Sequence, residues 1–170
     1  MTNPGDLKVT ARGDREIVIT RSFDASRVLV WEAYNDPELL KRWLLGPPGW
    51  SMVVCELARK AGEPYHYLWR HEDGCEMGIH GEAREIIPPE RVVFTELMDG
   101  QPGESLVTTV LVEEAGKTFL TTTAVYASRE VREMVLKSGM ERGIAASYQR
   151  LDEILRTRGA QAKQKSVGEV

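Results

Sequence analysis

Three histidines are the first side chains in this sequence to consider for chemistry. They are His66, His71 and His80, all in a stretch that alternates like β-strands. A zinc site needs three or four ligands that converge on one point. His66 and His71 are separated by an odd number of positions on one expected strand, so they should point to opposite faces. The sequence therefore predicts no metal site.

Carboxylates on the middle strands are the next candidates, for acid–base catalysis. His80, Glu82, Glu85 and Glu96 all fall on these strands, and a catalytic group must sit in a dry cleft with a shifted pKa. His80 and Glu85 are the candidate catalytic residues. The alternative that we favour is a set of structural ion pairs, such as Glu85 with Arg91. The chain shows no Ser-His-Asp set, phosphate loop or dinucleotide fingerprint.

Aromatic and methionine side chains give a stronger signal for binding. Flexible methionines beside aromatic rings make adaptable apolar pockets, although the same residue types also fill ordinary cores. As a group they fall on elements that would surround a cavity between a helix and a sheet. These residues are Trp31, Trp43, Trp50, Met52, Tyr65, Tyr67, Trp69, Met77, Phe94, Met98, Tyr126, Met134 and Met140.

A long C-terminal helix is the element around which the chain is organised. Apolar residues recur at helical spacing from Ser128 to Arg158, which predicts one continuous amphipathic helix. Ser128 is a suitable N-cap, and Gly159 is the expected stop. Gly139 and Gly143 lie on one face of this helix, where they allow either close packing on a strand or room for a ligand.

Period-two alternation predicts a sheet for most of the remaining chain. One strand precedes two short helices. Asp24 or Ser26 should cap the first, and Asp36, followed by Pro37, should cap the second. Six further strands, joined by hairpin turns, make a seven-stranded curved antiparallel sheet wrapped around the long helix. The expected strands are 15–23, 51–57, 64–71, 77–87, 91–98, 105–114 and 117–126.

Length and charge limit the classes of protein that this chain can represent. Its 170 residues and 42% hydrophobic content fit one α+β domain, over residues 15–158, between a flexible arm (1–14) and a disordered tail (159–170). A net charge of −4 argues against nucleic-acid binding. We expect no membrane insertion, no signal peptide and a cytoplasmic location. The two cysteines, Cys55 and Cys75, should stay free thiols.

Four motifs resemble one known family. The runs Phe23–Trp43, Gly46–Trp50, Ile86–Val93 and Gly139–Leu155 resemble, in order, those of proteins related to the activator of heat shock protein 90 ATPase. That family belongs to the START-like, or SRPBCC, superfamily, so the resemblance implies a helix-grip fold. The superfamily holds hydrophobic ligands between helix and sheet, and its members include carriers, sensors, cyclases and co-chaperone domains. A shared fold does not transfer one of these functions.

The sequence thus predicts a carrier or sensor that binds a small hydrophobic or amphipathic molecule between the long helix and the sheet, without a cofactor. His80 and Tyr126 would orient the ligand through polar groups. A cyclase-like or hydrolase-like enzyme that uses His80 or a buried glutamate, a chaperone-binding domain, and a homodimer all stay open. The expected apolar contacts are Trp43, Trp50, Met52, Tyr67, Trp69, Met77, Val135, Met140 and Ile144.

Overall fold

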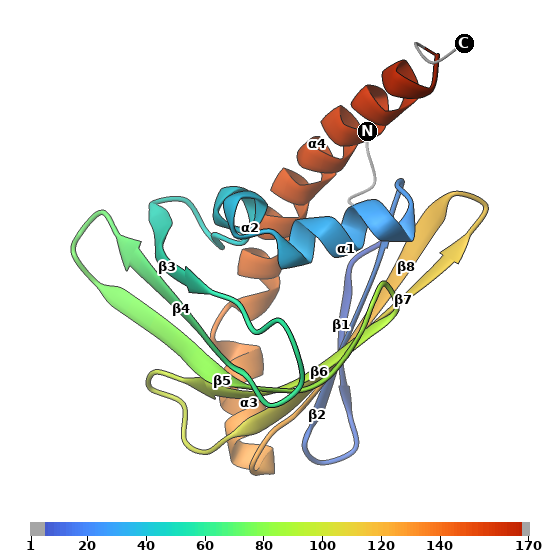
Figure 1. Ribbon diagram of the computed structural model, residues 1–170. Coiled ribbons are helices and arrows are strands. Elements are labelled where there is room, and N and C mark those ends of the chain that lie inside the picture. Colours follow the sequence, from blue (N-terminus) through green and yellow to red (C-terminus); the bar gives the residue numbers. More distant parts are fainter. Residues whose placement is uncertain (1–5, 168–170) are drawn as a thin grey trace.

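The computed structural model describes residues 6–167, with side chains up to residue 164. Figure 1 shows a curved sheet with helices α1, α2 and α4 on one side of it. Eight antiparallel strands form this sheet in the order β1-β2-β8-β7-β6-β5-β4-β3. The strands are β1 Lys8–Arg12, β2 Glu16–Phe23, β3 Trp50–Glu56, β4 Pro64–His71, β5 Glu76–Ile87, β6 Arg91–Met98, β7 Ser105–Glu114 and β8 Lys117–Val125.

Four helices complete the fold: α1 Arg27–Asn35, α2 Pro37–Trp43, α3 Arg129–Lys137 and α4 Met140–Val167. The N-terminal caps of α1 and α2 follow the sequence prediction. The Ser26 hydroxyl accepts from the backbone N–H of Leu29, and the Asp36 carboxylate accepts from that of Glu38. These side chains satisfy N–H groups that the first turn of a helix leaves without partners. The α+β helix-grip prediction is confirmed.

The strand count differs from the predicted seven. The additional strand, β1, lies in the expected flexible arm and pairs with β2 from Lys8 opposite Thr20 to Arg12 opposite Glu16. Leu7, Val9 and Ala11 alternate with polar residues here, but the run is short and most of its side chains are exposed, so its pattern is weaker than that of the longer strands. Backbone pairing with β2 holds it in place. Residues 1–5 of the expected arm lie outside the described residues.

The predicted single C-terminal helix is two helices. Ser128 caps α3 as expected, by accepting from the N–H of Val131. Gly139 then adopts a φ of 85°, a left-handed conformation that glycine reaches without steric cost and that ends a helix. Gly143 faces a loop rather than a strand, because a Cβ there would lie 3.5 Å from the Pro47 ring.

The prediction that Gly159 ends the helix is wrong. Helix α4 continues to Val167, and Figure 1 shows its C-terminal part projecting away from the sheet. Glycine inside a helix costs about 1 kcal/mol relative to alanine. This cost is too small to end α4 at Gly159. The predicted disordered tail is therefore helical up to residue 167, and residues 168–170 lie outside the described residues. No described helix is both long and apolar enough to span a membrane.

One row of residues defines the inner face of the sheet, which points toward the helices. By strand register Ile17 lies opposite Ala124, Ala124 opposite Val107, Val107 opposite Phe94, and Phe94 opposite Ala83. All five are buried or partly buried in the core. Residues two positions away on each strand share this face because side chains alternate along a strand, except where a bulge interrupts the register.

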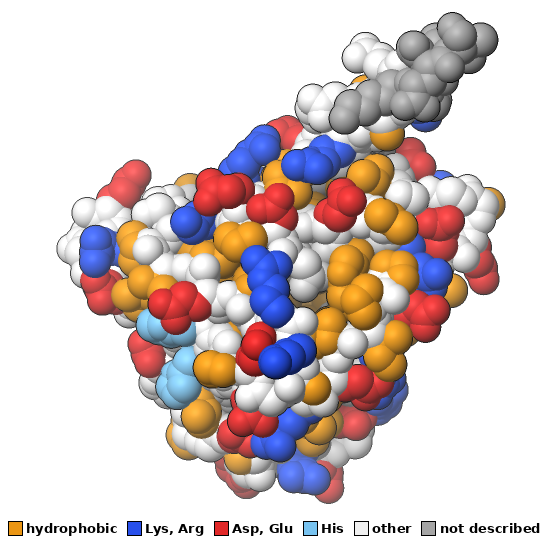
Figure 2. Space-filling view, in the orientation of Figure 1, with side chains coloured by type: hydrophobic (Ala, Val, Ile, Leu, Met, Phe, Trp, Pro, Cys, Tyr) orange, Lys and Arg blue, Asp and Glu red, His pale blue; other side chains and the backbone are white. Residues whose placement is uncertain are grey.

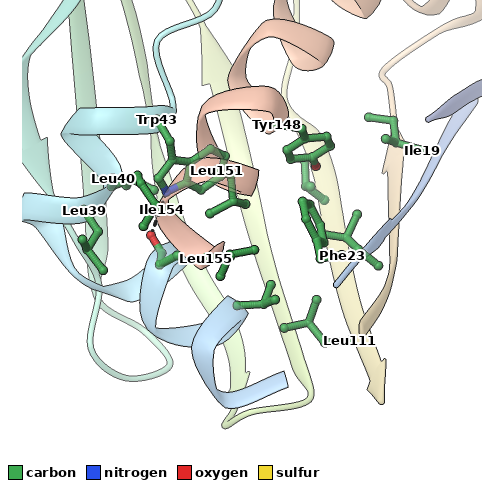
Figure 3. Close-up of a cluster of buried hydrophobic side chains, with 14 of the residues drawn as sticks. Ile19, Phe23, Leu39, Leu40, Trp43, Leu111, Tyr148, Leu151, Ile154 and Leu155 are labelled. Carbon is green, nitrogen blue, oxygen red and sulfur yellow. Dashed lines mark hydrogen bonds between the residues drawn. The ribbon is translucent and has the colours of Figure 1, made fainter. Parts of the chain in front are cut away.

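The core lies between this inner face and helices α1, α2 and α4. Figure 3 shows Phe23 of β2 beside Tyr148 of α4, with Trp43 of α2 close to Leu151. The rings of Phe23 and Tyr148 meet edge to face, with centroids 5.3 Å apart. Trp43 is fully buried, and its indole N–H donates to the Ala33 carbonyl over 2.9 Å. Helix α4 therefore packs largely through the two short helices.

A buried ion pair ties α4 to the sheet. The Arg21 guanidinium on β2 donates to both carboxylate oxygens of Asp152 on α4, over 2.7 and 2.6 Å. Its carbon lies 4.6 Å from the centre of the Phe23 ring and 5.5 Å from that of Tyr148. The Arg21 side chain is 1% exposed and that of Asp152 is 32% exposed. A bidentate pair of this kind fixes geometry as well as charge.

This pair predicts a large effect of Asp152→Asn on stability. The substitution leaves a buried guanidinium without a counter-charge, so we expect the free energy of unfolding to fall by about 3 kcal/mol. Urea unfolding at pH 7 measures the change. Glu153→Gln is the matched control, since it removes a neighbouring carboxylate that is not in an ion pair with any described residue. An equal effect of the two substitutions would contradict the assignment.

Candidate functional site

A pocket opens between the two short helices and the sheet. Figure 2 shows hydrophobic side chains gathered below α1 on this side of the molecule. The pocket is walled by α1, α2, the segment after β3, and strands β4–β7. Its lining residues are Trp31, Tyr34, Asn35, Leu40, Leu44, Leu57, Ala58, Tyr65, Tyr67, Ala83, Glu85, Ile86, Val92, Val93, Phe94, Thr109 and Leu111.

The size of the pocket suits a small molecule. Its volume is about 140 Å³, close to the roughly 150 Å³ of an engineered apolar cavity that binds benzene. Drug-sized ligands occupy roughly 300–1,000 Å³. Aromatic rings form one wall, where Tyr65 contacts both Phe94 and Tyr67 at centroid distances of 5.2 and 5.4 Å. The pocket can therefore hold one ring-sized apolar group.

Most polar groups in the wall already have partners within the protein. The Tyr65 hydroxyl donates to the Thr95 carbonyl over 2.6 Å, and the Tyr34 hydroxyl bonds that of Tyr148 over 3.1 Å. The Asn35 amide donates to the Trp31 carbonyl over 2.9 Å. Because such groups need nothing from a ligand, the surface that remains is mainly apolar, and an apolar guest leaves few polar groups unpaired.

The structure places the predicted contacts in different environments. Tyr67 lines the pocket. Trp43, Met52 and Trp69 are buried in the core, and the Trp69 indole N–H donates to the Leu44 carbonyl over 2.7 Å. These three side chains therefore act as core, which was the alternative to ligand contact.

The other predicted contacts lie away from the pocket. Tyr126 is buried in the core, and Trp50 packs at the sheet edge against His71, with ring centroids 5.0 Å apart. Met77, Val135, Met140 and Ile144 are partly buried around the core cluster and do not line the pocket. The pocket lies beneath the short helices, and not under the long helix as predicted.

Several lining residues were absent from the predicted contacts. Trp31, Tyr65 and Phe94 belonged to the aromatic group but were not chosen, whereas Leu57 and Val92 carry no distinguishing signal. For Trp31 and Phe94, the signal in the sequence that could have indicated the pocket was their position along the chain. Trp31 follows the cap of the first short helix, and Phe94 shares a strand face with Glu96.

The candidate catalytic residues do not form an acid–base site in this pocket. His80 is exposed, and it pairs with Leu97 and His66 on the outer face of the sheet. Glu85 reaches the pocket wall, but its carboxylate lies 3.4 Å from the Arg91 guanidinium. The interpretation of Glu85 and Arg91 as an ion pair across the turn is therefore confirmed.

Glu96 is the carboxylate with the most unusual environment. It lies on the inner face of β6, two residues from Phe94, and is partly buried. Burial raises its pKa to about 7 because a low-dielectric site disfavours the charged form. Its negative charge adds to the effect of burial in raising the pKa values of Tyr67 and Tyr126. Such a shift marks a candidate functional group.

Histidine, cysteine and carboxylate side chains do not gather into a metal site among the described residues. His71 pairs locally with Asp73 at 3.1 Å, in the turn that follows β4. Cys55 is partly buried, and Cys75 is exposed.

The fold and the pocket define the class of protein: a helix-grip domain with a small apolar cavity. The family model described as "Activator of Hsp90 ATPase homolog 1-like protein" matches residues 24–156. The chain therefore belongs to this family, as its motifs predicted. No curated protein matches the chain in sequence.

Solved structures of bacterial proteins share the fold. A Rhodobacter sphaeroides protein is 30% identical, with a TM-score of 0.84, over 89% of this chain and 99% of that one. A Mycobacterium smegmatis protein is 23% identical, with a TM-score of 0.75, over 87% and 97%. A Silicibacter pomeroyi protein is 21% identical, with a TM-score of 0.69, over 84% and 99%.

The environment of Glu96 predicts a pH-dependent stability. Since its folded pKa of about 7 lies above the ordinary 4.5, the folded state binds more protons between these values. The contribution of Glu96 to stability therefore falls as pH rises from 4.5 to 7. Glu96→Gln removes this loss, so at pH 8 the variant should be more stable than wild type by on the order of 3 kcal/mol.

Urea unfolding at pH 4 and pH 8 tests this prediction. The stability difference between Glu96→Gln and wild type should grow from pH 4 to pH 8. Glu104→Gln, in the exposed loop before β7, is the control and should show no such growth. A Glu96→Gln effect that is the same at both pH values would show that the carboxyl titrates normally.

Proposed function

We propose that this protein binds a small, largely apolar molecule, about the size of one aromatic ring, in the pocket beneath α1 and α2. The observation that carries the proposal is a pocket of about 140 Å³ with an aromatic wall. Exclusion of water from such surface favours binding by about 25 cal/mol per Å² of apolar area buried. Binding without catalysis is sufficient for a carrier or a sensor, so we propose one of these two roles.

We take the segment after β3 as the entrance to the pocket, because it lines the pocket and is not part of the sheet. Leu57 and Ala58 lie in the irregular segment after β3 and are only partly buried. Arg59 follows them, and its guanidinium donates to the Asn35 carbonyl over 3.1 Å, which links this segment to the end of α1. Movement of the segment would open the pocket without unpairing strands, because loops require less free energy to open than strands of the core.

An enzymatic role is the second candidate, favoured by Glu96. A carboxyl with a pKa of about 7 can both donate and accept a proton near neutral pH. Mass analysis of a molecule recovered after binding separates the two roles. An unchanged mass supports binding alone, whereas a product that wild type forms and Glu96→Gln does not form supports catalysis.

The family description mentions activation of a chaperone ATPase, and a chaperone partner stays a prediction for this chain. A pull-down with this chain as bait tests it. Recovery of a chaperone by wild type and by a variant with a blocked pocket would separate this role from ligand binding.

Ala58→Trp tests the proposed function directly. The indole would fill the entrance from a partly buried position and should weaken binding of the probe indole at least about tenfold, or about 1.4 kcal/mol. Lys60→Trp adds the same side chain at an exposed position that does not line the pocket, and should bind like wild type. Isothermal titration calorimetry measures the affinities.

Equal affinity of Ala58→Trp and wild type for indole would contradict this location of the site. Unfolding midpoints of both variants in urea verify that each is folded, so a loss of binding reports on the pocket.

A further inference from the structure

Glu96 is the middle residue of a row of five on the inner face of the sheet. Register places Tyr65 of β4 opposite Gly81 of β5, and Ser105 of β7 opposite Glu96 of β6. The pairing of Ile79 with Met98 puts Gly81 opposite Glu96, and that of Leu106 with Val125 puts Tyr126 beyond Ser105. We name Tyr65, Gly81, Glu96, Ser105 and Tyr126 the Glu96 niche.

The two neighbours of Glu96 in this row are small. Gly81 cannot carry a side chain, because a Cβ would clash with the Thr95 carbonyl and lie 3.0 Å from the Tyr65 ring. The Tyr65 ring thus lies close to Gly81, and its hydroxyl reaches the Thr95 carbonyl on β6 over 2.6 Å. Ser105 is fully buried. The Glu96 side chain is therefore flanked by short residues and bounded by two phenol rings.

Glu96 is the charged residue of the niche, and its charge is negative. No described Lys, Arg or His forms an ion pair with Glu96. Burial raises the pKa of Tyr65, and the charges of Glu96 and Glu104 add to this effect, so both carboxylates act on the same phenol. Aromatic faces also attract cations, within about 6 Å of the ring centre. A positive group is the complement of such surroundings.

We propose that the Glu96 niche binds the ammonium group of a small aromatic amine whose ring occupies the adjoining pocket. Tyr65 borders both regions, and Phe94 in the pocket wall lies two residues from Glu96 on the same face of β6. That spacing is about 7 Å along a strand, the reach of a ring with a short amine chain. The inference rests on the proposed function, because the pocket must hold the ring.

Binding would place the ammonium against the ionised Glu96 carboxylate. This pair forms a charge-assisted hydrogen bond, and the cation replaces the water that a charged carboxylate otherwise needs. The facing titratable groups are Tyr65 and Tyr67 of β4, Tyr126 after β8, and Glu104 of the loop before β7. The three tyrosines are neutral at pH 8, because the ordinary tyrosine pKa is about 10 and burial raises it further here.

A matched pair of probes tests the niche. Calorimetry compares 2-phenylethylamine, which is a cation throughout this pH range, with the neutral 2-phenylethanol. Wild type should bind the amine at least about tenfold more tightly than the alcohol at pH 8. The preference should shrink at pH 5.5, where Glu96 is protonated. Glu96→Gln should bind the alcohol like wild type and lose the preference, and Glu82→Gln, an exposed carboxylate on the outer face of β5, should keep it.

Each other outcome has a definite meaning. Equal binding of amine and alcohol by wild type, or a preference that persists in Glu96→Gln, overturns the inference while alcohol binding upholds the proposed function. Binding of neither probe overturns both. A preference lost equally in Glu82→Gln would show that it follows from the overall charge of the protein, and would also overturn the inference.

Discussion

The bidentate pair of Arg21 and Asp152 fixes how helix α4 sits on the sheet. Burying a guanidinium requires a counter-charge at a fixed distance, so the pair sets where α4 crosses β2. Phe23 and Tyr148 enclose the guanidinium from both elements. Because Tyr148 also stacks on Trp43 and bonds the Tyr34 hydroxyl, the same contact positions α2 and α1. The two short helices thereby become the roof of the pocket.

The pocket follows from this arrangement of layers. Helix α4 packs through α1 and α2, which hold the strands β4–β7 at a distance that their side chains do not fill. Tyr65 bridges the sheet beside Gly81 and reaches Thr95, which leaves the apolar wall on one side and Glu96 on the other. One aromatic residue thus separates a region suited to a ring from a region suited to a charge, and an amphipathic ligand could use both.

Much of the fold could be predicted from the sequence because its signals are local. Alternation located seven strands to within a residue at each end, and the capping side chains of Ser26, Asp36 and Ser128 marked three helices. The break at Gly139 and the continuation through Gly159 could not be separated, since both are glycines in an amphipathic pattern and only φ distinguishes them. Strand β1 was missed because its alternation of Leu7, Val9 and Ala11 with polar residues spans only a few positions.

The site was harder to predict because it depends on how the layers meet. Glu96 was among the candidate carboxylates, but its burial depends on β4, β5 and β7, which the sequence does not bring together. Tyr67, one of the predicted ligand contacts, lines the pocket, whereas Trp43 and Trp69 are aromatic residues of the same kind that fill the core. Residue type alone does not distinguish a core ring from a pocket ring; the packing of α1 over the sheet does.

The most direct test of the account is a two-dimensional amide NMR titration of the protein with toluene, an apolar probe without charge. A guest beneath the short helices should shift the amide signals of Trp31, Leu57 and Val92, whose side chains line the pocket. Shifts confined to Met140 and Ile144 on α4, or no shifts at saturating toluene, would contradict the central claim that this fold keeps an apolar binding pocket under α1 and α2.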